Sequence, residues 1–300
     1  GSTSMGNILT KQFYRQRKDF EDSCAGRDAG LTFPEGVRCS TDIAYADDGI
    51  KAHLLDIYRP EDSQEKVLPV IINVHGGGLI IGNKEFNRYF CALLCKKGFL
   101  VYSIEYRLIP DCLIYDQLAD VFMAMDYIKE RLAADGGDSS HVYMAGDSGG
   151  ACLITYANAI QNSTNIARAA NVTPSGLRIN ALGLISGMFY TSRFDKIGLF
   201  LPKYLYGRDY KKTPFAKYVN PENRELLNSL APVWLVTSHN DFLRRYTTDF
   251  EKALTRAERE HELVVFPKNK MLTHAFSVFE PFLPESSAVI DMMVEYLRKF

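Results

Sequence analysis

Short apolar runs alternate with longer segments of helical periodicity through most of the chain. Apolar runs of four to eight residues, rich in β-branched side chains, are typical of strands buried on both faces of a parallel sheet. We expect six such strands, at residues 67–74, 99–104, 141–145, 181–185, 233–237 and 263–266. Two more polar, alternating segments, 43–45 and 54–58, are interpreted as antiparallel edge strands.

The segments between these runs carry apolar residues three and four positions apart, which predicts amphipathic helices. We expect helices within residues 118–132, 151–160, 242–254 and 289–300. Because strands and helices alternate, the predicted fold class is α/β, with a mostly parallel central sheet flanked by helices and right-handed crossovers. Residues 187–230 break the alternation and are unusually aromatic. We interpret them as a cap over a cleft, although surface helices that merely pack on the domain are the alternative.

The strongest chemical signal lies at residues 143–150, Tyr-Met-Ala-Gly-Asp-Ser-Gly-Gly. A predicted strand leads into Gly-x-Ser-x-Gly and a predicted helix follows, which is the context of a nucleophile elbow. The turn needs small residues at Gly146 and Gly150, and it would expose Ser148 at the amino end of the helix, where an anion is favoured. Asp147 is expected to point away and to be structural. An ordinary glycine-rich turn is the other interpretation.

A second motif, His75-Gly76-Gly77-Gly78, follows the predicted strand 67–74. Consecutive glycines let the backbone approach a ligand and present N–H groups to it. Acyl transfer needs such donors, because negative charge develops on the carbonyl oxygen. A phosphate-binding loop is the rival, but no Gly-Lys-Ser/Thr follows and the Gly-x-Gly-x-x-Gly spacing is absent. We interpret His75 as a support beneath the loop.

A serine nucleophile requires a base, which follows it in this architecture in the order Ser, Asp or Glu, His. Three histidines come after Ser148: His239, His261 and His274. His274 fits best, because it lies in a loop after a predicted strand; a surface loop histidine is the plainer interpretation. Asp241, in the loop after the preceding strand, would fix the tautomer of His274.

Together these motifs resemble those of the hormone-sensitive-lipase-like esterases, a branch of the α/β-hydrolases, from about residue 40 to the end. Residues 75–78 resemble the family's His-Gly-Gly-Gly, residues 105–110 its Asp-Tyr-Arg-Leu-Ala-Pro, and residues 146–150 its Gly-Asp-Ser-Ala-Gly. The stretches that begin at Asp241 and His274 resemble Asp-Pro-Leu-Arg and His-Gly-Phe.

The resemblance implies hydrolysis of short-chain carboxylic esters through an acyl-enzyme, without a cofactor or metal. It implies a triad of Ser148, Asp241 and His274, and an oxyanion hole from the N–H groups of Gly77, Gly78 and Gly149. It also implies a cap formed by residues 1–41 and 187–230 over a core of 42–186 and 231–300. Residues 1–4 are interpreted as a tag remnant before a start at Met5.

Several positions depart from the family pattern. Leu79 stands where an aromatic residue is usual, and Gly149 replaces alanine, which keeps the N–H but removes a methyl group. Phe242 and Arg245 replace the usual residues beside Asp241. The residues expected in the substrate pocket are Leu79, Phe189, Tyr190 and Phe276. The residues expected to give structural support are His75, Gly76, Asp147, Glu105 and Arg107, of which Glu105 replaces the usual aspartate.

Composition narrows the classes of partner. Thirty-five Lys and Arg residues balance 36 Asp and Glu residues, so the net charge of −1 gives no indication of nucleic acid or anionic lipid as a partner. The sequence has no apolar run long enough for a membrane span. Six cysteines without a C-x-x-C pair give no sign of zinc and favour a reducing, cytoplasmic setting. A homodimer is compatible with the sequence.

Other functions would use the same residues. Amide, formamide and lactone hydrolases and carbohydrate acetyl esterases are compatible with the triad, and nothing in the sequence separates them from an esterase. A non-catalytic small-molecule binder on a hydrolase fold is the alternative from another class, since fold alone does not decide function. It is disfavoured because all three triad positions are occupied.

Overall fold

The computed structural model describes residues 2–63 and 66–300. Its strands are β1 (Val37–Ala44), β2 (Leu54–Pro60), β3 (Leu68–Val74), β4 (Leu100–Ile104), β5 (Gly137–Asp147), β6 (Ala181–Ile185), β7 (Val233–Ser238) and β8 (His261–Phe266). They form one sheet in the order β1-β2-β4-β3-β5-β6-β7-β8. The β1–β2 and β2–β4 pairs are antiparallel, and the remaining pairs are parallel.

The expected strands are present, and every residue of β4, β6 and β7 is buried. The expectation that the strand at residues 263–266 is buried on both faces was wrong, because β8 lies at the edge of the sheet and none of its residues is buried. The expectation that β2 is an edge strand was wrong, since β2 lies between β1 and β4. Its polar residue Asp56 is buried and pairs with the Lys84 ammonium at 2.8 Å. A buried ion pair therefore allows a polar sequence to lie inside the sheet.

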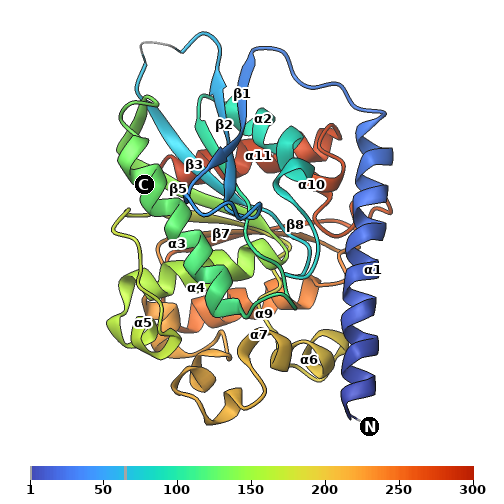
Figure 1. The fold of residues 1–300 in the computed structure, drawn as a ribbon. Coiled ribbons are helices and arrows are strands. Elements are labelled where there is room, and N and C mark those ends of the chain that lie inside the picture. Colours follow the sequence, from blue (N-terminus) through green and yellow to red (C-terminus); the bar gives the residue numbers. More distant parts are fainter. Residues whose placement is uncertain (1, 64–65) are drawn as a thin grey trace.

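Helices cover both faces of the sheet (Figure 1). One face packs on α3 (Ile114–Arg131), α4 (Gly149–Asn162) and α9 (Arg244–Arg256), and the other packs on α2 (Arg88–Cys95) and α11 (Pro284–Leu297). The shorter helices of the core are the 3₁₀ helix Lys84–Asn87, α5 (Thr164–Ala170) and α10 (Phe276–Phe279). Phe242 was expected on the face of α9, but it precedes that helix and is 75% exposed.

Two segments distant in sequence lie together on one side of the molecule. The first is the long helix α1 (Ser2–Asp28), which runs beside α6 in Figure 1. The second contains α6 (Lys196–Phe200), α7 (Pro202–Tyr206), the 3₁₀ helices Tyr210–Lys212 and Pro214–Tyr218, and α8 (Arg224–Asn228). The rings of Phe13 and Tyr204 join the two segments, with centroids 5.1 Å apart.

Hydrogen bonds also hold α1 to the core. The guanidinium of Arg17 donates to the carbonyl groups of Ile80 and Ile109 at 3.2 and 3.0 Å and pairs with Asp111 at 3.2 Å. The segment 1–41, expected as part of the cap, also contributes to the sheet, because β1 begins at Val37. Among the described residues, no helix is both long enough and apolar enough to cross a membrane.

Candidate active site

Ser148 lies in a tight turn between β5 and α4. Its φ of 50° and ψ of −118° are values that a non-glycine residue adopts only under constraint from its surroundings. The turn sits directly against the end of β3: a Cβ atom on Gly146 would lie 2.5 Å from the carbonyl oxygen of Val74, and one on Gly150 would lie 2.0 Å from it. Close packing on the backbone of β3 therefore explains why both flanking residues are glycines.

The glycine loop after β3 lies beside this turn. Gly77 and Gly78 have φ values of 120° and 62°, and a Cβ atom on Gly77 would lie 2.1 Å from the Ile81 carbonyl oxygen. A Cβ atom on Gly149 would lie 2.8 Å from the Leu79 nitrogen and 3.1 Å from the Gly78 nitrogen. The backbone of the loop at Gly78 and Leu79 therefore meets the amino end of α4 next to Ser148.

His274 and Asp241 are hydrogen-bonded to each other at the same edge of the sheet, with 2.7 Å between His274 Nδ1 and Asp241 Oδ1. The Asp241 carboxylate is buried and also accepts hydrogen bonds from the Leu243 N–H and the Thr237 hydroxyl. Burial alone would raise the pKa of Asp241, but these hydrogen bonds, above all that of His274, outweigh it and lower the pKa below its ordinary value. Asp241 therefore stays ionised beside the imidazole.

The loops that carry this pair are fixed in place. The Asp241 loop follows β7 and the His274 loop follows β8, and a parallel bridge joins Asn240 to Thr273. The N–H of Ala275 donates to the Ser186 hydroxyl at 3.0 Å, which ties the His274 loop to the end of β6. The loops after two neighbouring parallel strands therefore bring Asp241 and His274 together.

Ser148 and His274 line a single cavity of about 820 Å³, together with Gly77 and Gly78. No hydrogen bond joins the Ser148 hydroxyl to His274, both described residues, and such bonds in enzymes often tighten only when substrate is present. Most of the cavity wall is apolar. The other lining residues are Leu9, Gln12, Phe13, Gln16, Phe20, Ile80, Ile81, Asp147, Met188, Lys196, Ile197, Phe200, Leu201, Phe242, Leu243 and Phe279.

The four residues expected in the substrate pocket lie elsewhere. Leu79, Phe189, Tyr190 and Phe276 are all buried, and none is among the residues that line the cavity. Phe189, for example, stacks on Phe250 with ring centroids 4.3 Å apart.

The aromatic wall comes instead from residues that sequence reasoning missed. Phe13 and Phe20 lie on α1, Phe200 lies on α6, Phe279 lies on α10, and the Phe242 ring lies beside His274 with centroids 4.6 Å apart. Two of these residues had a signal in the sequence: Phe200 lies in the aromatic segment 187–230, and Phe242 departs from the family pattern beside Asp241.

His75 supports the oxyanion loop from within the core. Its Nδ1 donates to the Gly76 carbonyl oxygen at 2.7 Å, its Nε2 lies 2.8 Å from a carboxylate oxygen of Glu105, and its ring stacks on Tyr106. Burial by itself lowers the pKa of His75, but the hydrogen bond and charge of Glu105 outweigh it and raise the pKa. Both ring nitrogens of His75 therefore face a partner oxygen within the core, which fits a supporting role better than that of a catalytic base.

The remaining supporting residues are also buried or paired. Asp147 accepts hydrogen bonds from the Gly76 N–H at 3.1 Å and from the Asn87 side chain at 3.0 Å, so it links the nucleophile turn to the glycine loop. Burial raises the pKa of Asp147. The guanidinium of Arg107 donates to Asp120, which is fully buried.

A mostly parallel eight-stranded sheet with a sharp serine turn after β5, an acid after β7 and a histidine after β8 defines an α/β hydrolase. The chain belongs to the alpha/beta hydrolase fold family, whose model matches residues 71–277. This match confirms the predicted fold class and the family resemblance drawn from the motifs.

Several known proteins with related sequences are esterases by name. The chain is 29% identical over 184 residues to a protein named probable isoprenylcysteine alpha-carbonyl methylesterase of Oryza sativa subsp. japonica, which covers 58% of this chain and 44% of that protein. It is 32% identical over 120 residues to esterase LipQ of Mycobacterium tuberculosis, covering 39% of this chain and 28% of that protein. The chain thus spans less than half the length of these curated relatives.

A solved structure with a similar fold is esterase B from Lactobacillus Rhamnosis (HN001). The TM-score is 0.92 at 21% sequence identity, and the match covers 99% of this chain and 96% of that chain. At this identity the similarity concerns the fold. It extends over α1 and the 187–230 insertion as well as over the sheet.

Proposed function

We propose that this protein is a serine carboxylic-ester hydrolase that works through an acyl-enzyme intermediate. The observation that carries the proposal is the hydrogen-bonded pair of Asp241 and His274, which shares one cavity with Ser148 and the glycine loop. Ester hydrolysis needs a nucleophile, a base held in one tautomer and donors for the developing anion. All three are expected at this edge of the sheet.

In the proposed reaction each of the three side chains has its own role. Asp241 accepts a hydrogen bond from Nδ1 of His274, which leaves Nε2 free to take the proton of the Ser148 hydroxyl as its oxygen attacks the ester carbonyl. The tetrahedral intermediate collapses, and the alcohol leaves with the proton from Nε2. Water then attacks the acyl-enzyme by the reverse sequence of proton transfers, which releases the acid and restores Ser148.

The backbone N–H groups of Gly77, Gly78 and Gly149 would stabilise the oxyanion. Removing one such donor from comparable sites costs roughly 3 kcal/mol of transition-state stabilisation. The buried pair of His75 and Glu105 and the hydrogen bonds of Asp147 hold the loop in place before substrate arrives. The stabilising groups therefore need little reorganisation during the reaction.

The family resemblance implies a short acyl group, and the cavity bears on the rest of the substrate. Its volume of about 820 Å³ exceeds what a short acyl group would fill, and its wall is mostly aromatic and aliphatic. We therefore infer that the remaining part of the ester is apolar. A sugar acetate fits less well, because Gln12, Gln16 and Lys196 are almost the only polar side chains on the wall away from the triad.

Ser148→Ala tests the proposal. We expect it to abolish turnover of p-nitrophenyl butyrate and covalent labelling by a fluorophosphonate probe, while the melting temperature stays close to that of the wild type. Ser139→Ala is a matched control, because Ser139 is exposed at the opposite end of the same strand, β5. Wild-type turnover by Ser148→Ala would refute a serine mechanism at this site.

A further inference from the structure

One segment of the expected cap, residues 194–217, is strongly basic, although the chain as a whole is nearly neutral. We call this segment the outer cap face. Residues 194–217 contain six basic residues and two acidic residues, whereas the net charge of the whole chain is −1. All six basic side chains are exposed: Lys196, Lys203, Arg208, Lys211, Lys212 and Lys217. Within the described part of the chain, none of the six takes part in an ion pair. Lys196 also lines the catalytic cavity, and the other five cations face solvent.

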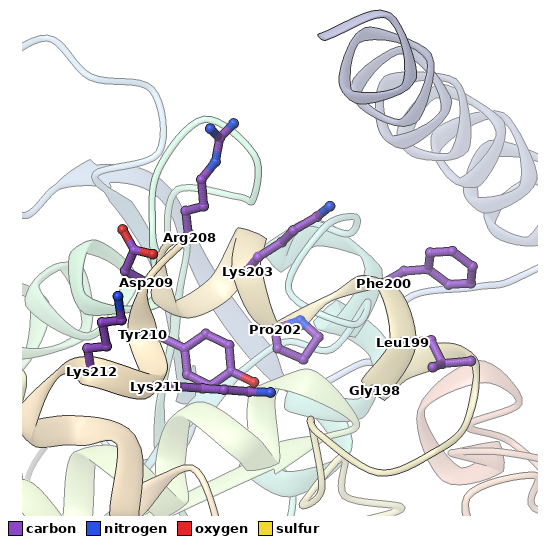
Figure 2. Close-up of a pocket in the computed structure, with 10 residues that line it drawn as sticks. All are labelled: Gly198, Leu199, Phe200, Pro202, Lys203, Arg208, Asp209, Tyr210, Lys211 and Lys212. Atoms are coloured by element: carbon purple, nitrogen blue, oxygen red, sulfur yellow. The ribbon is translucent and has the colours of Figure 1, made fainter. Parts of the chain in front are cut away.

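Four of these side chains surround a hollow of about 430 Å³ on the cap, outside the catalytic cavity. Figure 2 shows Lys203, Arg208, Lys211 and Lys212 around Pro202 and Tyr210, with Leu199 and Phe200 at the end nearer α1. Asp209 is the one acidic residue that lines the hollow. An excess of cations around an apolar floor suits an anionic head group that is attached to an apolar chain.

Large exposed apolar side chains lie in the same segment as these cations, and two of them, Leu199 and Phe200, line the hollow. Phe194 is 94% exposed, and Leu199 and Phe200 are more than half exposed. Exposed apolar clusters of this kind mark contacts with proteins or membranes. Phe200 lines both the hollow and the catalytic cavity, so the basic and apolar surface is continuous with the route to Ser148.

We propose that the outer cap face, residues 194–217, docks the protein on an anionic lipid surface, from which apolar esters enter the catalytic cavity. Exposed aromatic and aliphatic residues flanked by lysines and arginines are the composition that binds at such surfaces. A nucleic acid would use the cations but not Phe194 and Leu199. A second copy of this face would be repelled by its own charge. The entry of lipid-borne esters rests on the proposed function, whereas the docking does not.

Flotation with lipid vesicles tests the docking. The wild-type protein should float with vesicles of phosphatidylcholine and phosphatidylglycerol but not with phosphatidylcholine alone, and high salt should release it. The triple variant Lys203→Glu, Lys211→Glu, Lys212→Glu should partition at least about 100-fold less, since each cation near an anionic surface contributes about fivefold. Phe194→Ser with Leu199→Ser should also weaken binding, although it leaves the charge unchanged.

A second triple variant with the same change in net charge tests whether the position of the lysines on the outer cap face matters for vesicle binding. The control variant carries Lys96→Glu, Lys129→Glu and Lys252→Glu. These three lysines are exposed and lie just after α2, on α3 and on α9, respectively. The control should bind anionic vesicles like the wild type. Both triple variants should hydrolyse soluble p-nitrophenyl butyrate at the wild-type rate, because none of the lysines changed in either variant lines the catalytic cavity. Hydrolysis of an apolar ester carried in anionic vesicles should fall only in the cap-face variant.

The outcomes distinguish the two proposals. Turnover of the soluble ester without vesicle binding would overturn the docking and leave the esterase standing. Vesicle binding without Ser148-dependent turnover would overturn the esterase proposal and leave the docking standing. Equal binding to neutral vesicles, an equal loss in both triple variants, or retention by duplex DNA in place of vesicles would each overturn the docking.

Discussion

Gly149→Ala adds a single methyl group next to the nucleophile, and the structure predicts a large loss of activity from it. The added Cβ would lie 2.8 Å from the Leu79 nitrogen and 3.1 Å from both the nitrogen and the carbonyl carbon of Gly78. These are backbone atoms, so no side-chain rotation relieves the contact. The N–H of Ile109 and the side chain of Gln117 both donate to the Leu79 carbonyl oxygen and hold the loop from its other side.

The loop or the first turn of α4 must therefore shift by several tenths of an ångström, which moves the N–H of Gly78 away from the oxyanion. Loss of one oxyanion donor lowers kcat about 100- to 1000-fold, equivalent to roughly 3 kcal/mol. Folding stability should change much less, because alanine is favoured over glycine in a helix by about 1 kcal/mol, which offsets part of the strain. The variant should thus lose most of its activity while it keeps most of its folding stability.

The assay is kcat and KM for p-nitrophenyl butyrate, measured alongside thermal unfolding. We expect the loss in kcat, with KM nearly unchanged. Gly26→Ala is the matched control, since a Cβ there meets nothing within 4 Å and Gly26 lies outside the cavity. Wild-type kcat in Gly149→Ala would refute the close packing of the glycine loop on α4 as the origin of the oxyanion site.

Two further predictions concern the groups that hold the site. Asp241→Asn should lower kcat about 10⁴-fold with little change in the melting temperature, because an amide no longer enforces the productive tautomer of His274; a loss below tenfold would contradict this role. The raised pKa of His75 makes a stabilising contribution that is complete below the unfolded value near 6.5 and is lost as the pH rises through the folded pKa. Urea titrations should show this decline above about pH 6.5 in the wild type and a flatter profile in Glu105→Gln; identical profiles would exclude the ion pair as its cause.

The strands and the members of the proposed triad could be predicted because each is associated with a pattern in a short stretch of sequence. Strands buried on both faces need continuous apolar runs, and Ser148 needs small neighbours at a sharp turn. Asp241 and His274 follow from the order of the loops along parallel strands. β2 was misplaced because the pairing of Asp56 with Lys84 depends on a contact between residues 28 positions apart, which alternation within one segment does not show.

The cavity wall could not be predicted for a related reason. Phe20 and Phe200 belong to segments more than 150 residues apart, and they share a wall because α1 lies against the 187–230 segment. Helical periodicity placed Phe242 on the buried face of α9. The Asp241 loop instead ends before α9 begins, which leaves the Phe242 ring beside His274 with centroids 4.6 Å apart.

Two departures from the family motif are connected through one contact. Leu79 has a φ of 72° and is fully buried, so its side chain enters the core and leaves the wall at this point to Ile80 and Ile81. In this conformation the Leu79 nitrogen lies where a methyl group on residue 149 would otherwise go. The buried leucine and the missing methyl group of Gly149 therefore fit each other. A loop of this shape requires glycine at position 149, which keeps the backbone of the glycine loop close to the first residue of α4.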